Sequence, residues 1–174
     1  VAAGSYAELG DAPAPFTAQT LPLPASPYGL TKLLATEVLR MRALEEQSST
    51  VVLRAANLYG PGQRPSYFIP SLLRTLHQGE RFSMSPGEQK REFLYVDDFV
   101  DALILASEVP LSWEQDDDGA PFCMLYVGDG TPLPLKDVAQ LAQRAMQVDG
   151  LLGIGERPYR RREQMAMFAD LSLT

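Results

Sequence analysis

The chain has 174 residues, of which 45% are hydrophobic and 21% charged, a composition typical of a globular domain with a sizeable core. Its formal net charge of −7 argues against binding to nucleic acid or an anionic membrane, and no apolar run approaches the roughly 18 residues of a membrane span. The single cysteine, Cys123, excludes an internal disulfide and a paired-cysteine metal site, so we expect no bound metal and a cytoplasmic location.

Helical and β-rich segments alternate along the chain, which predicts an α/β fold with a parallel sheet. In chain order we expect a strand end at 1–3, an irregular proline-rich loop over 11–24, a helix over 27–46, a strand over 50–53, a helix over 69–78, a strand over 91–96, a helix over 99–107, a strand over 122–127 and a helix over 134–147. Apolar residues recur at helical spacing in the helix over 27–46, which predicts a face that packs on the sheet. These residues are Leu30, Leu33, Leu34, Val38, Met41 and Leu44.

The segment Ser-Pro-Tyr-Gly-Leu-Thr-Lys at 26–32 opens this helix and holds a tyrosine and a lysine four residues apart. Ser26 is expected to cap the helix and Pro27 to be its first residue, so that Tyr28 lies in the first turn. Positions i and i+4 share one helix face, and both the Lys32 ammonium and the positive end of the helix dipole favour the phenolate form of Tyr28. The pattern predicts a tyrosine that donates and accepts a proton, although an incidental pair on a surface helix has the same spacing.

Two further polar residues follow predicted strands. Ser5 comes after the first strand, where the residue taken alone favours a simple turn residue over a functional one. Asn57 begins a glycine- and proline-rich run at the carboxyl end of the strand over 50–53, the end where ligands bind in open α/β sheets, but a plain turn also explains it. A serine hydrolase is disfavoured because Ser5 does not lie in a G-x-S-x-G pattern and the lone His77 is poorly placed.

Three segments, SPYGLTK, VVLRAANLYGPGQ and REFLYVDD, together resemble the extended short-chain dehydrogenase/reductases, and in particular the NAD-dependent epimerase/dehydratase family that acts on nucleotide sugars. The resemblance implies the C-terminal part of a Rossmann-like parallel sheet plus a smaller α/β substrate-binding region. It assigns residues 1–60 to a remnant of the NAD-binding domain with the catalytic serine and Y-x-x-x-K pair. Residues 61–174 are then mainly the substrate region, returning in part to the Rossmann sheet.

The same resemblance implies NAD or NADP as cofactor, a nucleotide sugar as substrate, and a homodimer for the full-length protein. The implied catalytic residues are Ser5, Tyr28 and Lys32. The implied cofactor contacts are Tyr28, Lys32 and the backbone of Ala55 and Ala56. The implied substrate contacts are Asn57, Arg91 and Arg160. Both arginines are expected at the diphosphate, since a guanidinium forms paired charge-assisted bonds to phosphate oxygens; a solvated basic turn is the alternative for residues 157–162.

The residues after Ser5 bear on the type of reaction. Dehydratases of the family carry an aspartate and a glutamate directly after the serine or threonine, whereas Tyr6 and Ala7 stand here. The resemblance therefore implies an oxidoreductase or isomerase, either a 4-epimerase or a 4-ketoreductase, with hydride transfer to or from NAD(P) and Tyr28 as general acid and base. A 4,6-dehydratase and a non-catalytic interaction module are the alternatives.

The family's glycine-rich turn for the cofactor pyrophosphate has no counterpart in these 174 residues. We therefore expect the chain to be a fragment that lacks the N-terminal glycine-rich half of such an enzyme. On its own, this fragment is expected to be inactive.

Overall fold

The computed structural model describes residues 1–108, 116 and 119–172, and its centre is a three-stranded parallel sheet in the order β1-β2-β7. The strands are Ala2–Ser5, Thr50–Ala55 and Phe122–Val127. Ser5 pairs with Ala55, and Ala55 pairs with Val127, so the three strands end at one edge of the sheet. The predicted α/β fold with a parallel sheet is confirmed, and β1 and β2 each run two residues beyond their expected ends.

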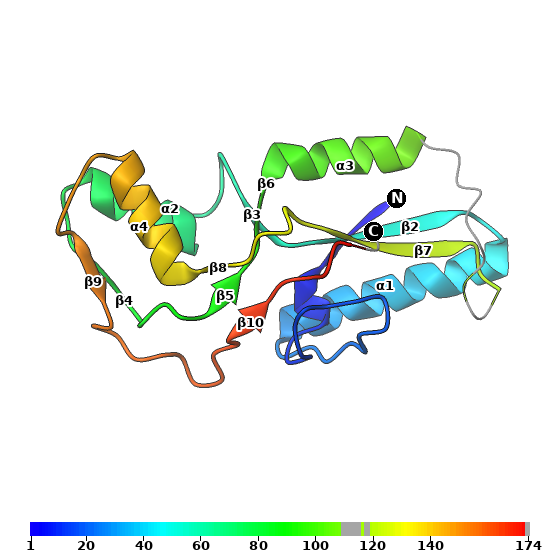
Figure 1. Ribbon diagram of the computed structural model, residues 1–174. Helices are drawn as coiled ribbons and strands as arrows, with labels where there is room; N and C mark the ends of the chain where they lie inside the picture. Colours follow the sequence, from blue (N-terminus) through cyan, green and yellow to red (C-terminus); the bar gives the residue numbers. More distant parts are fainter. Residues whose placement is uncertain (109–115, 117–118, 173–174) are drawn as a thin grey trace.

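Two helices lie on opposite sides of this sheet, α1 (Pro27–Glu46) and α3 (Val96–Glu108) (Figure 1). The start of α1 is as predicted, since the Ser26 hydroxyl accepts a hydrogen bond from the Gly29 amide at 3.0 Å. The helix ends at Glu46, and the residue that caps it, Gln47, has a left-handed φ of 48°. Among the described residues, no helix is both long and apolar enough to cross a bilayer.

The side of α1 that packs on the sheet is not the predicted apolar face. Its buried residues are Gly29, Thr36 and Ala43, which recur every seventh position. Small side chains allow a close approach, and a Cβ atom added to Gly29 would lie 2.1 Å from the carbonyl oxygen of Ala7. The residues that meet the sheet are small because the backbone of α1 approaches it closely there, and the predicted apolar stripe lies on another side of the helix. The exposed apolar residues are Leu30, Leu34, Val38, Met41 and Leu44.

A smaller part of the chain gathers beyond one end of the central sheet (Figure 1). Here α2 (Phe68–His77) and α4 (Leu135–Ala145) pack on each other and on a parallel pair of strands, β4 (Phe82–Met84) and β9 (Leu152–Ile154). The two helices were predicted to within two residues at each end. β4 and β9 were missed, since three-residue strands leave little periodicity to detect.

Short strands connect the two parts of the molecule. β3 (Asn57–Tyr59) pairs in parallel with β6 (Phe93–Tyr95). β5 (Lys90–Arg91) lies between β10 (Ala166–Met167) and β8 (Leu133–Pro134). The strand predicted over 91–96 is therefore divided into β5 and β6, with Glu92 between them.

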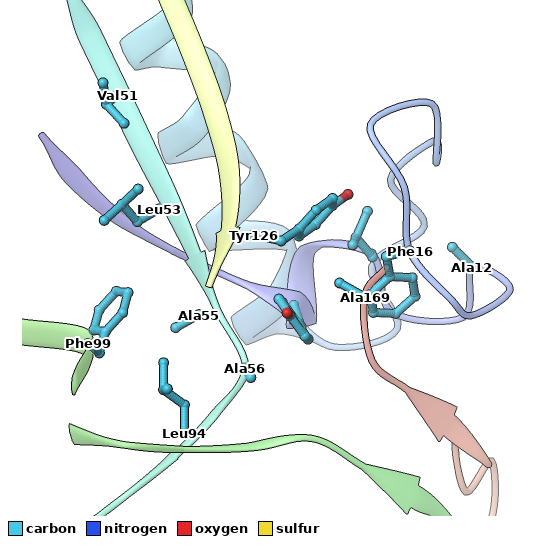
Figure 2. Packing of buried hydrophobic residues seen from close by; sticks show 12 residues of the cluster. Ala12, Phe16, Val51, Leu53, Ala55, Ala56, Leu94, Phe99, Tyr126 and Ala169 are labelled. Carbon is cyan, nitrogen blue, oxygen red and sulfur yellow. The ribbon is translucent and has the colours of Figure 1, made fainter. Parts of the chain in front are cut away.

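The main core lies around the carboxyl-terminal half of the central sheet (Figure 2). The ring of Tyr6, in the 3-10 helix η1 (Tyr6–Glu8), meets Phe16 and Tyr126 edge to face, with both centroid distances 5.7 Å. The Tyr126 hydroxyl donates to the carbonyl of Thr17 at 3.0 Å. These aromatic contacts fix the strand ends that carry Ser5 and Ala55.

Candidate functional site

One side of α1 is attached to β1 and η1 at three successive points. The Lys32 ammonium donates to the carbonyl oxygen of Ala3 at 2.8 Å, and the Thr36 hydroxyl donates to Oε2 of Glu8 at 3.0 Å. The backbone of Gly29 packs closely against Ala7. These contacts bring the first turn of α1, which carries Tyr28, beside the segment that carries Ser5. Tyr28 is 58% exposed, so its phenol is open to a ligand.

Ser5 forms a capping box around η1. Its hydroxyl oxygen accepts a bond from the Ala7 amide at 3.2 Å, and its own amide donates to Oε1 of Glu8 at 2.8 Å. Since the Ser5 oxygen already accepts this bond, its proton is free to be donated to an oxygen of a ligand. Ser5 also pairs in register with Ala55, which places two of the predicted site residues side by side.

Ala55 and Ala56 have buried side chains at the end of β2, and the Ala56 amide donates to the carbonyl of Val127 at 2.9 Å. Asn57 follows, and both its backbone amide and its side-chain nitrogen donate to the carbonyl of Glu92, at 3.1 and 2.9 Å. Within the described part of the chain, the side-chain oxygen of Asn57 has no hydrogen-bond partner. The amide group is thus held in one orientation with an acceptor available.

Arg91 is largely buried, and its guanidinium is already bonded by protein groups. It donates to Oε1 of Glu163 at 3.0 Å, to the carbonyl of Gln164 at 2.5 Å and to the carbonyl of Lys90 at 2.9 Å. Burial lowers the pKa of Arg91 from its ordinary value, and the charge of Glu163 opposes that shift. Arg160 is exposed, and its carbonyl accepts from the Glu163 amide at 3.0 Å, so Glu163 connects the segments of both predicted arginines.

Two buried carboxylates near these residues were missed by the sequence analysis. The Glu8 carboxylate accepts a hydrogen bond from Nε of Arg54 at 2.9 Å. The Glu92 carboxylate accepts hydrogen bonds from the backbone amides of Gly130 and Ala169 at 2.8 and 3.3 Å. Glu8 could have been found, because Ser5-Tyr6-Ala7-Glu8 has the S-x-x-E spacing of a capping box. Glu92 carries no such local signal, since its partners are 38 and 77 residues away in the sequence.

A cavity of about 470 Å³ between α2 and the loop after β3 is lined mainly by apolar side chains, including Tyr59, Ile69, Leu73 and Tyr95. None of the eight predicted site residues lines it. In the part of the chain that the structure describes, no group of three or more His, Cys, Asp or Glu side chains could hold a metal ion.

The sequence profile of the NAD dependent epimerase/dehydratase family matches residues 1–117. The dTDP-4-dehydro-6-deoxyglucose reductase of Escherichia coli is 26% identical over 83% of this chain. The structure of MoeE5 in complex with UDP-glucuronic acid and NAD is 31% identical, with a TM-score of 0.81 over 98% of this chain. The UDP-glucose 4-epimerase of Thermotoga maritima, solved with UDP-glucose, is 25% identical, with a TM-score of 0.83 over 98% of this chain.

The chain spans about half the length of these relatives, namely 44% of the reductase, 55% of MoeE5 and 53% of the epimerase. The matches confirm the predicted family resemblance and the Rossmann-like fold. They include reductases, epimerases and a 4,6-dehydratase, and so do not select one reaction.

Proposed function

This chain belongs to the NAD-dependent epimerase/dehydratase family, and from this premise we propose that the full-length protein is a nucleotide-sugar 4-epimerase or 4-ketoreductase. One observation supports the proposal: α1, which carries Tyr28 and Lys32, is attached to the β1–η1 segment, which carries Ser5. Relatives that hold NAD support NAD or NADP as the cofactor, and the small buried side chains of Ala55 and Ala56 suit the close approach of a flat ring.

In the proposed reaction Tyr28 takes the proton of a sugar hydroxyl while the carbon that bears this hydroxyl loses a hydride. A nicotinamide held beside Tyr28, Lys32 and the backbone of Ala55 and Ala56 would supply the acceptor and donor for this hydride. The positive charge of Lys32 stabilises the phenolate of Tyr28, and Ser5 donates a hydrogen bond to the reacting oxygen. In a reductase the steps run in reverse, with Tyr28 protonating the carbonyl oxygen. In an epimerase, return of hydride to the opposite face of the sugar changes the configuration.

On the substrate side, Arg91, Arg160 and Asn57 are proposed to hold the nucleotide diphosphate and sugar. The two arginine segments meet at Glu163, and the Asn57 amide is fixed by the residue next to Arg91. This supports one continuous substrate surface from the strand ends to residues 160–164. The division of the chain at residue 60 and the cytoplasmic location stay predictions.

A 4,6-dehydratase is the second candidate activity, and the conformation of η1 argues against it. Tyr6 is buried among aromatic rings, and burial, together with the nearby Glu92 carboxylate, raises the pKa of its hydroxyl, which therefore stays neutral. Ala7 has no ionisable group. Glu8 is the acidic residue of η1, and its carboxylate faces Arg54 in the interior. Residues 6–8 thus offer no exposed acid or base for the loss of water.

We also propose that the full-length protein is a homodimer that pairs through the α1 stripe, by which we mean Leu30, Leu34, Val38 and Met41. These four apolar side chains are exposed at helical spacing. Glu37 and Arg40, an ion pair at 3.1 Å, lie along one side of the stripe. In a two-fold dimer the stripe of each copy would meet the same stripe on the other. Light scattering should show that Val38→Glu converts a dimer to a monomer; a wild-type monomer would contradict the proposal.

The reaction is tested by incubating the full-length protein with NAD and nucleotide sugars such as UDP-glucose and UDP-glucuronic acid, and with NADPH and 4-keto nucleotide sugars. The expected product is a 4-epimer or a reduced 4-keto sugar, identified by NMR. A stable 4-keto-6-deoxy product would instead establish a dehydratase. Absence of both cofactor binding and turnover with all of these substrates would favour the non-catalytic alternative.

The role of Tyr28 is tested by Tyr28→Phe, which removes the proton-carrying oxygen and keeps the ring. Loss of a general acid–base group is expected to lower kcat by roughly 10²- to 10⁴-fold. Tyr67→Phe is the matched control, since Tyr67 is another exposed tyrosine outside the predicted site. Near-normal turnover by Tyr28→Phe would exclude Tyr28 as the proton carrier.

A further inference from the structure

A single buried carboxylate connects three elements of the candidate site. Oε1 of Glu8 accepts the Ser5 amide at 2.8 Å, and Oε2 accepts the Thr36 hydroxyl at 3.0 Å and Nε of Arg54 at 2.9 Å. The Glu8 side chain is fully buried, and the Arg54 side chain is 1% exposed. A Cβ atom on Gly4 would lie 2.8 Å from Oε1, so the backbone of β1 also closes around the carboxylate.

Stability alone is a weak reason for this arrangement. Removing a carboxylate and a guanidinium from water is costly, and apolar residues of similar size often replace such a pair without loss of stability. The Arg54 side chain carries an additional cost, because its Nη1 is buried with no hydrogen-bond partner among the described residues. What apolar residues cannot reproduce is the set of directed bonds that join the three elements.

Each of the three hydrogen-bond donors to Glu8 belongs to, or lies close to, a residue proposed to take part in the reaction. The first donor is the amide of Ser5 itself. Thr36 lies four residues after Lys32, on the same side of α1, and both side chains are bonded to the β1–η1 segment. Arg54 immediately precedes Ala55, which pairs with Ser5 in the sheet. A displacement of Glu8 would therefore change the position of Ser5 relative to α1.

We propose that Glu8 is a positioning residue that fixes the Ser5 hydroxyl relative to Tyr28 and Lys32. Glu8 does not touch the substrate in this role; it acts through Ser5, Thr36 and Arg54. The inference rests on the proposed function, because it concerns the alignment of the groups that carry out that reaction. A misplacement of about 1 Å among such groups lowers a rate by up to roughly a hundredfold.

The test is Glu8→Gln in the full-length protein, assayed with the nucleotide sugar that the wild-type protein converts, with UDP-glucose as the first probe. Glutamine keeps the shape of the side chain but has one acceptor oxygen, so it cannot accept all three bonds at once. We expect kcat to fall by roughly 10- to 100-fold. The KM for the nucleotide sugar should stay within about twofold, since Arg91 and Arg160 lie on other elements.

The controls separate positioning from folding. Leu76→Val, in the core between α2 and β4, should lower the unfolding temperature without lowering kcat. If Glu8→Gln does not fold, Thr36→Val decides, because it removes one of the three bonds without leaving a buried charge unpaired; kcat should then fall at least about twofold at constant KM. A folded Glu8→Gln protein with wild-type kcat, or a Thr36→Val protein with wild-type kcat, overturns the proposal.

Tyr28→Phe, assayed in parallel, separates a failure of the positioning role of Glu8 from a failure of the proposed reaction. An inactive Tyr28→Phe protein beside a fully active Glu8→Gln protein contradicts only the positioning role. A fully active Tyr28→Phe protein contradicts the proposed reaction mechanism, and the positioning role falls with it.

Discussion

The two parts of the molecule differ in whether they contain a buried ion pair, since exposed pairs such as Arg42–Glu46 on α1 also occur in the first part. In the part built on β1, β2 and β7, Glu8 and Arg54 form an ion pair that is inaccessible to solvent. In the part built on α2, α4, β4 and β9, the pairs Arg81–Glu156 and Lys136–Glu88 lie at the surface, with the side chains of the first pair 56% and 38% exposed. Arg91–Glu163, between the two parts, is intermediate in burial.

This difference matches the different tasks proposed for the two parts. A buried, directed ion pair holds one geometry and is little affected by salt, which suits groups that must align for proton and hydride transfer. Exposed pairs contribute little to stability and exchange readily with solvent ions. A partly buried arginine with a carboxylate partner can exchange that partner for a phosphate, which suits a surface that must bind and release a nucleotide.

Of the changes that test this comparison, the largest effect is expected from breaking the close packing of the first part with Gly29→Ala. Alanine favours a helix, but its Cβ would lie 2.1 Å from the Ala7 carbonyl oxygen, so α1 must move away from η1. We expect a loss of about 1–3 kcal/mol of unfolding free energy and at least a tenfold fall in kcat. Thermal unfolding and steady-state kinetics measure both, with Glu45→Ala at an exposed position of α1 as control. Wild-type values for both quantities would show that this contact does not align the site.

A smaller effect is expected at the boundary between the two parts, from Arg91→Lys. Lysine keeps the charge but loses the planar pair of donors, so the KM for the nucleotide sugar should rise about tenfold while kcat changes little. Glu163→Gln removes the competing carboxylate beside Arg91 and should leave KM unchanged or lower it. An unchanged KM in Arg91→Lys would argue against a phosphate contact.

The smallest effect is expected in the second part, from Glu156→Gln. Hydrogen bonds from Arg81 and Ser83 hold the pKa of Glu156 below its usual range in the folded protein. A lowered folded pKa adds stability above the ordinary glutamate pKa of about 4.3, and this stability is lost as the pH falls through the folded value. The difference in unfolding temperature between wild type and Glu156→Gln should therefore be small near pH 7 and vanish in acid. A difference in unfolding temperature that grows as the pH falls would contradict the lowered pKa of Glu156.

Much of the fold could be predicted because the information was local. The cap of α1 at Ser26, its first residue Pro27 and the strand over 122–127 follow from residue types at adjacent positions. The first helical residue of α3 could not be fixed in this way: the sequence predicted a start at residue 99, whereas the helix begins at Val96, so that Asp97 and Asp98 lie within its first turn.

For the candidate site, the sequence by itself determined the residue types at the strand ends and the Tyr28–Lys32 spacing on one helix. Only the tertiary structure decided which side of α1 meets the sheet, because a close backbone contact at Gly29 excludes the large apolar side chains from that side. It also decided that Glu8 meets Thr36 and Arg54, and that Arg91 meets Glu163. These partners lie 28, 46 and 72 residues apart, and bonds over such separations depend on the packing of whole elements, which no local pattern of residues encodes.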